Sequence, residues 1–499
     1  MQLNLEKNTV KITENVFEGT PEQGFETDIL LPDYCADITR ILKCNATSKI
    51  SRISQNGNHL DIDGAVLVCV YYLSDENKIN SYSTRLPFSK TLTVNDNGAL
   101  LTARVSSQIQ YLNCRAVNSR RLDIRGAVTL SICVFSPSEK AVVNNCDGGV
   151  ELLKNTLSNL CEIGEISRSF SVKEEVPSQN QITSILRTHA TAIPTEVKAI
   201  SNKLIIKGEM TVNLVTKNDS DSIEHSSYTI PISQIADLEG VDENCIYCVD
   251  FDVVSLDVNV RNGENSQTLE LDAKLLLTAN AKNTCEITVC DDCYGTKYET
   301  KSKSESITVK TLCEHIDETK SYRNTFTLPE GDSIICDLWY EEKPLTQSFE
   351  NKTLTLTLPV VVSIISQNEN GECHYSEQTL PVIEYKTVDA DNADFDGTAK
   401  VCACTYSMLS NGVDVSLTVR FSGDVISKKH ISVITDIECD ENKMYEDSDC
   451  ALTIYFSTQG ESVWEIGKRY HTKKEAIASA NNLDCDTVPG TILLIPTSM

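Results

Sequence analysis

Six segments of the 499-residue chain alternate apolar and polar residues with a period of two. They are LDIDGAVLVCV (60–70), LDIRGAVTLSI (122–132), LIIKGEMTVNL (204–214), LELDAKLLLTA (269–279), LTLTLPVVVSI (354–364) and VDVSLTVRF (413–421). In the first segment Leu60, Ile62 and Val66 share one face, while Asp61 and Asp63 point to the other, as in a half-buried strand. The sequence therefore predicts a mainly β protein built from antiparallel strands rather than from helices.

A longer repeat divides the chain into three parts. LPDYCADITRILKC (31–44) returns as VPSQNQITSILRT (176–188) and LPEGDSIICDLW (328–339), so that Ile38, Ile182 and Ile334 lie 144 and 152 residues apart. Such spacings match single domains. We expect three tandem antiparallel β-sandwich-like domains at 1–147, 148–295 and 296–435, the third degenerate. An acidic linker at 436–450 and a separate module at 451–499 should follow.

Asn-Gly pairs lie beside strand-like runs at 56–57, 97–98, 262–263, 370–371 and 411–412. Asn-Gly provides the positive φ that tight hairpins need, so each pair predicts a hairpin turn.

The first repeat contains Cys35 and Cys44, which raises the question of a metal or redox site. The second copy has no cysteine at either position, so no constant ligand set exists. The apolar residues at 38, 41 and 42 have helical spacing, which predicts a short helical turn capped by Asp37. We interpret the segment as a packing motif.

The net charge of −28 excludes whole classes of partner. A strongly acidic surface repels phosphate backbones and anionic lipids, so nucleic acid is not expected as a ligand. A basic patch on another protein remains a reasonable target, although such acidity also serves solubility alone. The longest apolar run, residues 65–73, is far too short to cross a bilayer, so no transmembrane segment is expected.

The first residues alternate polar and apolar side chains and lack the pattern of a signal peptide, which predicts a cytoplasmic protein. In that compartment the 20 cysteines should be reduced thiols. The best metal candidate is the pair Cys245 and Cys248 with the pair Cys290 and Cys293, which would suit zinc if the four thiolates converged. Because residues three apart on a strand face opposite ways, we favour core cysteines over a metal site.

No catalytic motif is present. The seven histidines are scattered, and phosphate-binding, dinucleotide-binding and nucleophile-elbow patterns are absent. Acidic pairs such as Asp291 and Asp292 are interpreted as solvated surface. We expect a protein that is not an enzyme and has no cofactor.

Residues 451–496 differ from the rest of the chain. An alternating strand is followed by helical periodicity and by a final apolar strand. Ser462 with Glu465, and Thr472 with Glu475, form two capping boxes, so two short helices should begin ten residues apart. The sequence predicts a βααβ unit of about 45 residues.

This unit resembles a LysM module. The resemblance rests on residues 460–464, Ile466, residues 468–470, Asn482, Leu483 and the PG and LLIP segments at 489–496. Glu461 stands where the family usually has Asp, and Gly467 where it usually has Ala. LysM modules bind N-acetylglucosamine-containing glycans between two loops. The resemblance implies a partner- or glycan-binding groove formed by Gly460, Glu461, Ser462, Val463, Trp464, Asn482, Leu483 and Asp484.

The repeats themselves resemble SPOCS domains, on LPDYCADITRILKC followed by LDIDGAVLVCVYYL. Three such copies before a LysM module resemble the family of SpoIVA-interacting proteins of spore-forming clostridia. That resemblance implies a non-enzymatic adaptor of spore coat assembly in the mother cell at the forespore surface. Its LysM module would bind a coat-assembly ATPase. The alternative is a protein that binds peptidoglycan or another N-acetylglucosamine-containing glycan.

Overall fold

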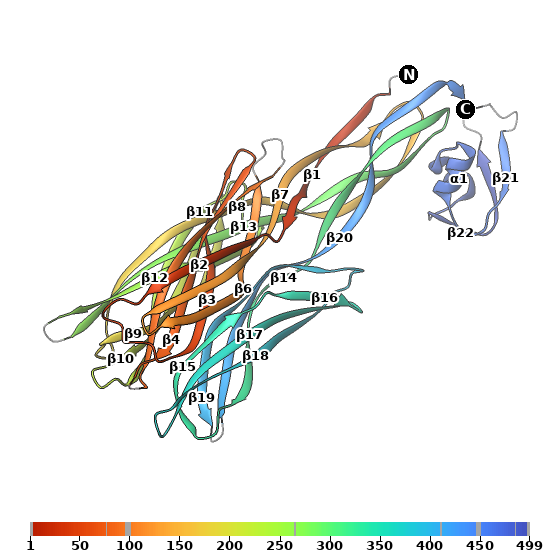
Figure 1. The fold of residues 1–499 in the computed structure, drawn as a ribbon. Coiled ribbons are helices and arrows are strands. Elements are labelled where there is room, and N and C mark those ends of the chain that lie inside the picture. The colour runs from red at the N-terminus through yellow and green to blue at the C-terminus, as the bar shows by residue number, and fades with distance from the viewer. Residues whose placement is uncertain are drawn as a thin grey trace.

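The computed structural model describes residues 3–75, 77–94, 101–263, 266–409, 412–445, 451–484 and 486–496. Within these ranges nearly all elements are strands, the strand pairs are antiparallel, and two short helices lie near the C-terminus. The predicted mainly β fold is confirmed (Figure 1). In the described residues, no helix has the length and apolar character needed to span a membrane.

The strands of residues 5–444 pair in three successive blocks of two sheets. Block 1, residues 5–146, has one sheet in the order β3-β4-β5 and another in the order β1-β7-β2, with β6 also paired to β7. Its strands are β1 (Leu5–Gly19), β2 (Glu22–Leu30), β3 (Arg40–Asn56), β4 (His59–Leu73), β5 (Ile79–Thr93), β6 (Thr102–Asn118) and β7 (Arg121–Cys146).

Block 2, residues 150–295, repeats this plan with the sheets β11-β10-β9 and β12-β13-β8. One continuous strand, β8, takes the place of β1 and β2. The strands are β8 (Val150–Pro177), β9 (Ser184–Ile200), β10 (Lys203–Lys217), β11 (Ile223–Asp237), β12 (Ile246–Asn262) and β13 (Gln267–Gly295).

Block 3, residues 298–444, has the sheets β14-β20-β19 and β15-β17-β16, with β18 also paired to β17. Its strands are β14 (Tyr298–Thr327), β15 (Asp332–Glu342), β16 (Thr346–Glu350), β17 (Thr353–Asn368), β18 (Cys373–Thr387), β19 (Asp394–Leu409) and β20 (Gly412–Met444). Residues 436–444, for which the sequence predicts a linker, are the end of β20 and pair with β14.

Each of the six alternating segments lies in the central strand of its sheet: β4, β7, β10, β13, β17 or β20. A central strand is paired on both edges, and its apolar face packs on the other sheet of the block. In block 1, for example, Leu60 and Ile62 of β4 share one core with Leu122 and Ile124 of β7.

The predicted helical turn near residue 38 is wrong. The chain is irregular up to residue 39, and residues 41 and 42 lie in β3, where pairing with β4 overrides the helical spacing. Asp37 caps no helix; it accepts hydrogen bonds from Arg120 (2.7 Å) and Ser119 (3.0 Å).

Asn-Gly turns join β3 to β4 and β17 to β18, where Gly57 and Gly371 have φ values of 61° and 82°. These two hairpin predictions are confirmed. Gly263 follows the end of β12, and its N–H donates to the carbonyl of Ser266 (2.9 Å). Residues 97–98 and residue 411 lie outside the described ranges.

Six long strands extend beyond the sandwiches as three two-stranded ribbons, which we call the stalk. The ribbons are the distal parts of β1 with β7, β8 with β13, and β14 with β20 (Figure 1). Isolated ribbons are marginal in water. These three share an apolar core of Val10, Ile12, Val142, Ile287, Val289, Ile307, Val309 and Val433. Each block therefore contributes one ribbon to a common structure.

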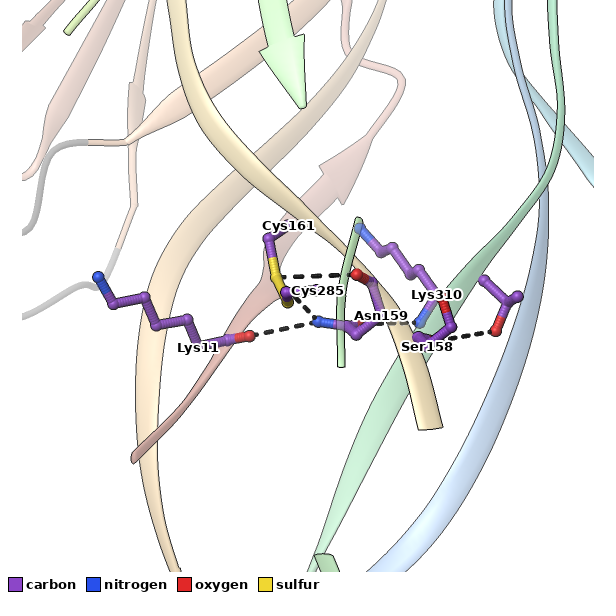
Figure 2. Close-up of a disulfide and its surroundings, with 7 residues drawn as sticks. Lys11, Ser158, Asn159, Cys161, Cys285 and Lys310 are labelled. Atoms are coloured by element: carbon purple, nitrogen blue, oxygen red, sulfur yellow. Dashed lines mark hydrogen bonds between the residues drawn. A yellow bond between two sulfur atoms is a disulfide. The ribbon is translucent and has the colours of Figure 1, made fainter. Parts of the chain in front are cut away.

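Asn159 of β8 joins the three ribbons at the base of the stalk (Figure 2). Its Nδ2 donates to the carbonyl of Lys11 in β1 (3.4 Å), and its Oδ1 accepts from the N–H of Lys310 in β14 (3.1 Å). A disulfide between Cys161 and Cys285 links β8 to β13 beside it. At this pair the structure differs from the expected reduced thiols, because adjacent strands place the two Cα atoms 6.5 Å apart, within disulfide range.

A buried ionic contact around Asp337 of β15 joins all three blocks. Arg187 of β9 donates two hydrogen bonds to this carboxylate (2.7 and 2.8 Å), and the hydroxyl of Tyr71 in β4 donates a third (2.5 Å). Burial alone would raise the pKa of Asp337, but Arg187 and the hydrogen bonds hold it below its ordinary value, so the carboxylate stays ionised.

A second ionic contact lies where the stalk meets the sandwiches. Asp396 of β19 pairs with Arg104 of β6 and with Lys282 of β13 (3.0 Å). Lys282 also donates to Asp424 of β20 (2.7 Å), and the Lys282 side chain is only 3% exposed. This contact again takes one or more residues from each block.

Gly126 of β7 provides a test of packing between strands. A Cβ at this position would lie 2.4 Å from the ring of Phe25 and 2.7 Å from the carbonyl oxygen of Tyr111. We expect Gly126→Ala to lower the free energy of unfolding by about 1–3 kcal/mol, because the strand cannot accommodate the methyl group. Urea denaturation followed by circular dichroism measures this loss.

Gly24→Ala is the matched control, since the nearest atom to a Cβ at Gly24 is 4.0 Å away on the same pair of strands. Equal denaturation midpoints for the two variants would contradict the packing argument.

Candidate functional site

The C-terminal module is the predicted βααβ unit. Strand β21 (Leu452–Phe456) pairs with β24 (Ile492–Pro496), and β22 (Gln459–Ser462) pairs with β23 (Thr487–Pro489). Helices α1 (Val463–Tyr470) and α2 (Lys474–Asn481) complete it. The core of the module is formed by Val463, Ile466, Ile477, Val488, Leu493 and Ile495.

For the first of the two predicted capping boxes, the role of Ser462 as the helix cap is confirmed. Ser462 Oγ accepts a hydrogen bond from the N–H of Trp464 (3.2 Å) at the start of α1. The prediction for Thr472 is wrong: α2 begins at Lys474 without a side-chain cap. Thr472 is buried, and its hydroxyl donates to the carbonyl of Pro496 (2.9 Å), because β24 lies within its reach.

Helix α1 is covered on two faces. One face packs into the module core, and the other lies against the end of the stalk. There Trp464 Nε1 donates to Asp292 of β13 (2.9 Å), and Lys468 Nζ donates to the same carboxylate (2.7 Å). The Trp464 ring meets the edge of Tyr294 at 4.7 Å between centroids and is only 6% exposed. These contacts define the seat of the module.

Gly467 lies at the closest approach of α1 to the seat. A Cβ there would lie 2.5 Å from the hydroxyl of Tyr294, which donates to the carbonyl of Thr472 (2.8 Å). His471, in a left-handed conformation after α1, stacks on Tyr445 at 3.5 Å. The seat therefore requires a residue without a side chain where LysM modules usually have Ala.

The eight predicted groove residues fall into two groups. Gly460, Asn482 and Asp484 are exposed, and Glu461, Ser462 and Leu483 are half-buried, in strand β22 before α1 and in the loop after α2. Val463 and Trp464 are buried, the first in the module core and the second in the seat. In this structure Trp464 contacts the stalk instead of lining the loops.

Glu461 is held inside the module by three groups. The hydroxyl of Tyr455 (2.7 Å) and the guanidinium of Arg469 (3.2 Å) donate to one oxygen, and the N–H of Thr458 donates to the other (3.2 Å). The hydrogen bond from Tyr455 is the main cause of a lowered pKa for Glu461. The carboxylate is therefore ionised and already paired at neutral pH.

The outer face of β21 and β24 is apolar and exposed. We call it the apolar face; its residues are Leu452, Ile454, Phe456, Ile492 and Leu494. Phe456 is 72% exposed and Ile454 63%. Ile454 lies opposite Leu494 and Phe456 opposite Ile492, so the side chains form one continuous patch. Contiguous exposed apolar patches occur at contact sites with proteins, membranes or ligands.

The four cysteines weighed as zinc ligands do not come together. Cys248 lies opposite Asn280 of β13, and Cys290 lies ten residues further along the same strand. At the rise of a strand this separates the two pairs by about 33 Å. Cys245 is buried beside Asp242, and Cys290 lies in the stalk core. Cys35 and Cys44 pack on the core of block 1.

A cavity of about 540 Å³ lies between the three blocks. Two of its cationic side chains bind within the protein: Arg187 pairs with Asp337, and Lys400 with Asp252 (2.7 Å). Burial, together with the charges of Arg187 and Lys49, lowers the pKa of His189 to about 3, so this histidine is neutral. The cavity lining thus serves contacts between blocks.

Sequence reasoning missed the seat and the apolar face. The sequence predicts solvated surface for Asp292, but this residue binds two residues that follow it by more than 170 positions. No local signal reports such a contact. The apolar face had a signal in the alternation of Leu452, Ile454 and Phe456, although alternation does not tell which face is covered.

The structure defines a class of protein: tandem two-sheet β blocks that hold a small βααβ binding module at the end of a stalk. The SPOCS domain of SipL matches residues 37–117 and 181–261, and the LysM domain matches residues 458–496. The chain thus contains two segments similar to the SPOCS domain and one similar to the LysM domain. Both are typically non-catalytic binding domains.

The two SPOCS matches cover equivalent structure. The first spans β3 to β6 and the second β9 to β12, and each begins within the repeated segment identified in the sequence. Block 3 has the same sheet plan with the added strand β16, although the matches do not extend to it. No curated protein and no solved structure matches the chain.

The seat predicts a specific effect of Gly467→Ala. The added methyl group cannot fit against Tyr294, so α1 should move away from the stalk and expose Trp464. In a Trp339→Phe background Trp464 is the single tryptophan. We expect a red-shifted emission and at least twofold stronger acrylamide quenching. Ser479→Ala, on the exposed side of α2, is the control and should leave both unchanged. Unaltered emission in Gly467→Ala would refute the seat.

Acid should release the module at a defined pH. Burial alone would raise the pKa of Asp292, but hydrogen bonds from Lys468 and Trp464 outweigh it, so the pKa lies below its ordinary value of 3.8. Because the pKa of Asp292 is lower in the folded state, the ionised carboxylate stabilises the contact fully when the pH is above the ordinary pKa. This stabilisation is lost as the pH falls through the lower, folded-state pKa. Trp464 emission should therefore be constant from pH 7 to about 4.5 and shift only below about 4. Asp292→Asn should remove the acid-dependent step; a step that persists in this variant would assign it to another group.

Proposed function

We propose that the chain is a non-enzymatic adaptor of spore coat assembly whose LysM module binds a coat-assembly ATPase. The three β blocks, with domains at 1–147, 148–295 and 296–435, serve as its scaffold. In a spore-forming host the adaptor works in the cytoplasm of the mother cell, at the forespore surface. This proposal extends the domain composition of the chain to a partner and a place.

The observation that carries the proposal is the apolar face. Five aliphatic or aromatic side chains on two paired strands form a surface that gains free energy by leaving water. The centre of a protein interface is apolar in this way, whereas a glycan site also needs polar groups that bind the sugar hydroxyls, and the apolar face has no such side chain among its five residues. The face therefore favours a protein partner over a glycan.

The seat supports the same conclusion. With α1 fixed to the stalk through Asp292 and Tyr294, the module is held in one orientation relative to the blocks. Fixing the orientation before binding lowers the entropy cost of engaging a second large molecule. The net charge of −28 adds a preference for a partner with a basic surface around the apolar contact.

The glycan alternative has the loops around Gly460 and Asn482 for a site, and both residues are exposed. Two features disfavour it. Trp464 is buried in the seat, and the Glu461 carboxylate is engaged by Tyr455 and Arg469, so neither is free to contact a sugar.

Two variants of the full chain separate the candidate functions. Ile454→Thr with Phe456→Ser makes the apolar face polar while keeping residues compatible with a strand. Asn482→Gly with Asp484→Ala changes the loops, and glycine suits the left-handed conformation of Asn482. We expect the first variant to bind the purified coat-assembly ATPase at least tenfold more weakly, and the second to bind it like the unaltered chain.

Sedimentation with insoluble peptidoglycan and chitin provides the complementary measurement. If the unaltered chain is retained on either glycan, and the loop variant is not, while neither protein binds the ATPase, the glycan function replaces the adaptor function. Circular dichroism shows that each variant has kept its fold.

A further inference from the structure

Three side chains of different chemistry meet where block 2 contacts block 3. Cys248 of β12, His315 of β14 and Asp424 of β20 place a sulfur, a nitrogen and an oxygen atom within 4.8 Å of one another. Cys248 belongs to block 2, and the other two belong to block 3. The cluster is separate from the LysM module and its seat.

Each oxygen of the Asp424 carboxylate has a hydrogen-bonding partner. His315 Nδ1 lies 2.7 Å from Oδ1, and Lys282 Nζ lies 2.7 Å from Oδ2. The Asp424 side chain is fully buried, whereas that of His315 is 32% exposed. One oxygen therefore faces the imidazole, the other is held by an ammonium group, and the partly exposed imidazole connects the cluster to solvent.

We propose that Cys248, His315 and Asp424 bind a divalent transition-metal ion of the zinc class. The ion would link block 2 to block 3, because it takes ligands from both. Thiolate, imidazole and carboxylate are the three ligand types that zinc takes in proteins. The thiolate and imidazole disfavour magnesium and calcium, which prefer oxygen ligands alone. Lys282 then acts as an outer partner that fixes the ligating carboxylate.

Asn280 offers a further oxygen on the same face. It lies directly opposite Cys248 in the ladder between β12 and β13, so both side chains point to one side of the sheet. Its Oδ1 is buried and has no hydrogen-bond partner. An orphaned buried acceptor opposite Cys248 is a candidate fourth donor for a tetrahedral ion, a position that water can also fill.

The charges around the cluster are compatible with a cation. Lys282 and Arg104 are neutralised by Asp396 and Asp424, which also face the thiol. Burial first, and then the negative charge of Asp424, raises the pKa of Cys248 to about 12. The ion takes the place of the thiol proton, which is released to solvent, so one proton leaves for each ion bound.

The test uses the full chain, stripped of metal with a chelator and dialysed, then titrated with cobalt(II) or zinc(II) alone. We expect about one ion per chain by elemental analysis and a thiolate-to-cobalt charge-transfer band. Cys248→Ser and His315→Gln should each weaken binding at least tenfold, and the band should vanish in Cys248→Ser. His315 is partly exposed, so its variant should keep the fold.

Cys245→Ser is the matched control, because this cysteine lies three residues before Cys248 but outside the cluster. Zinc should raise the thermal unfolding midpoint of the unaltered chain and of Cys245→Ser, and leave that of Cys248→Ser unchanged. Absence of the charge-transfer band, or equal binding by Cys245→Ser and Cys248→Ser, would overturn the proposal.

Discussion

The carboxylate of Asp337 constrains how the three blocks can be assembled. It is almost fully buried, and a buried charge is tolerated only when it is paired and hydrogen-bonded. Arg187 supplies the opposite charge in a two-point contact, and Tyr71 supplies a third hydrogen bond. Because these residues come from three blocks, the charge is satisfied only when all three are present in one orientation. Apolar contacts alone would allow the blocks to shift relative to one another, whereas the two parallel hydrogen bonds between Arg187 and Asp337 fix their relative position.

The stalk depends on the same assembly. Each ribbon is a continuation of central or flanking strands of one block, so the ribbons meet only if the blocks are already aligned. Once together they bury a core of their own, and Asn159 satisfies backbone groups of the two neighbouring ribbons. The module is then seated on residues of β13 that lie at the far end of the stalk. The contact around Asp337 therefore helps to determine where the module lies, because it aligns the blocks whose ribbons form the stalk.

Local patterns were sufficient to predict three features. Period-two alternation predicted the strands, Asn-Gly pairs predicted the turns at Gly57 and Gly371, and helical periodicity between two strands predicted the βααβ order of the tail. Each of these depends on neighbours in sequence. The failures depend on distant residues. Residues 41 and 42 lie in β3, which pairs with β4, although the spacing at 38–42 is helical. Thr472 does not cap α2, because its hydroxyl donates to the carbonyl of Pro496. The contacts of Trp464 with Asp292 and Tyr294 of β13 were missed as well, because no spacing in the sequence reports them.

The absence of a side chain at Gly467 has a consequence for how this protein can change over time. The space that a methyl group would need is filled by the hydroxyl of Tyr294, so helix and seat are a matched pair. A module transplanted from a protein with alanine at this place would not settle on this stalk. The module is therefore not interchangeable with others. A substitution in α1 where it contacts the stalk requires a matching substitution in the seat, so these two surfaces should have diverged together.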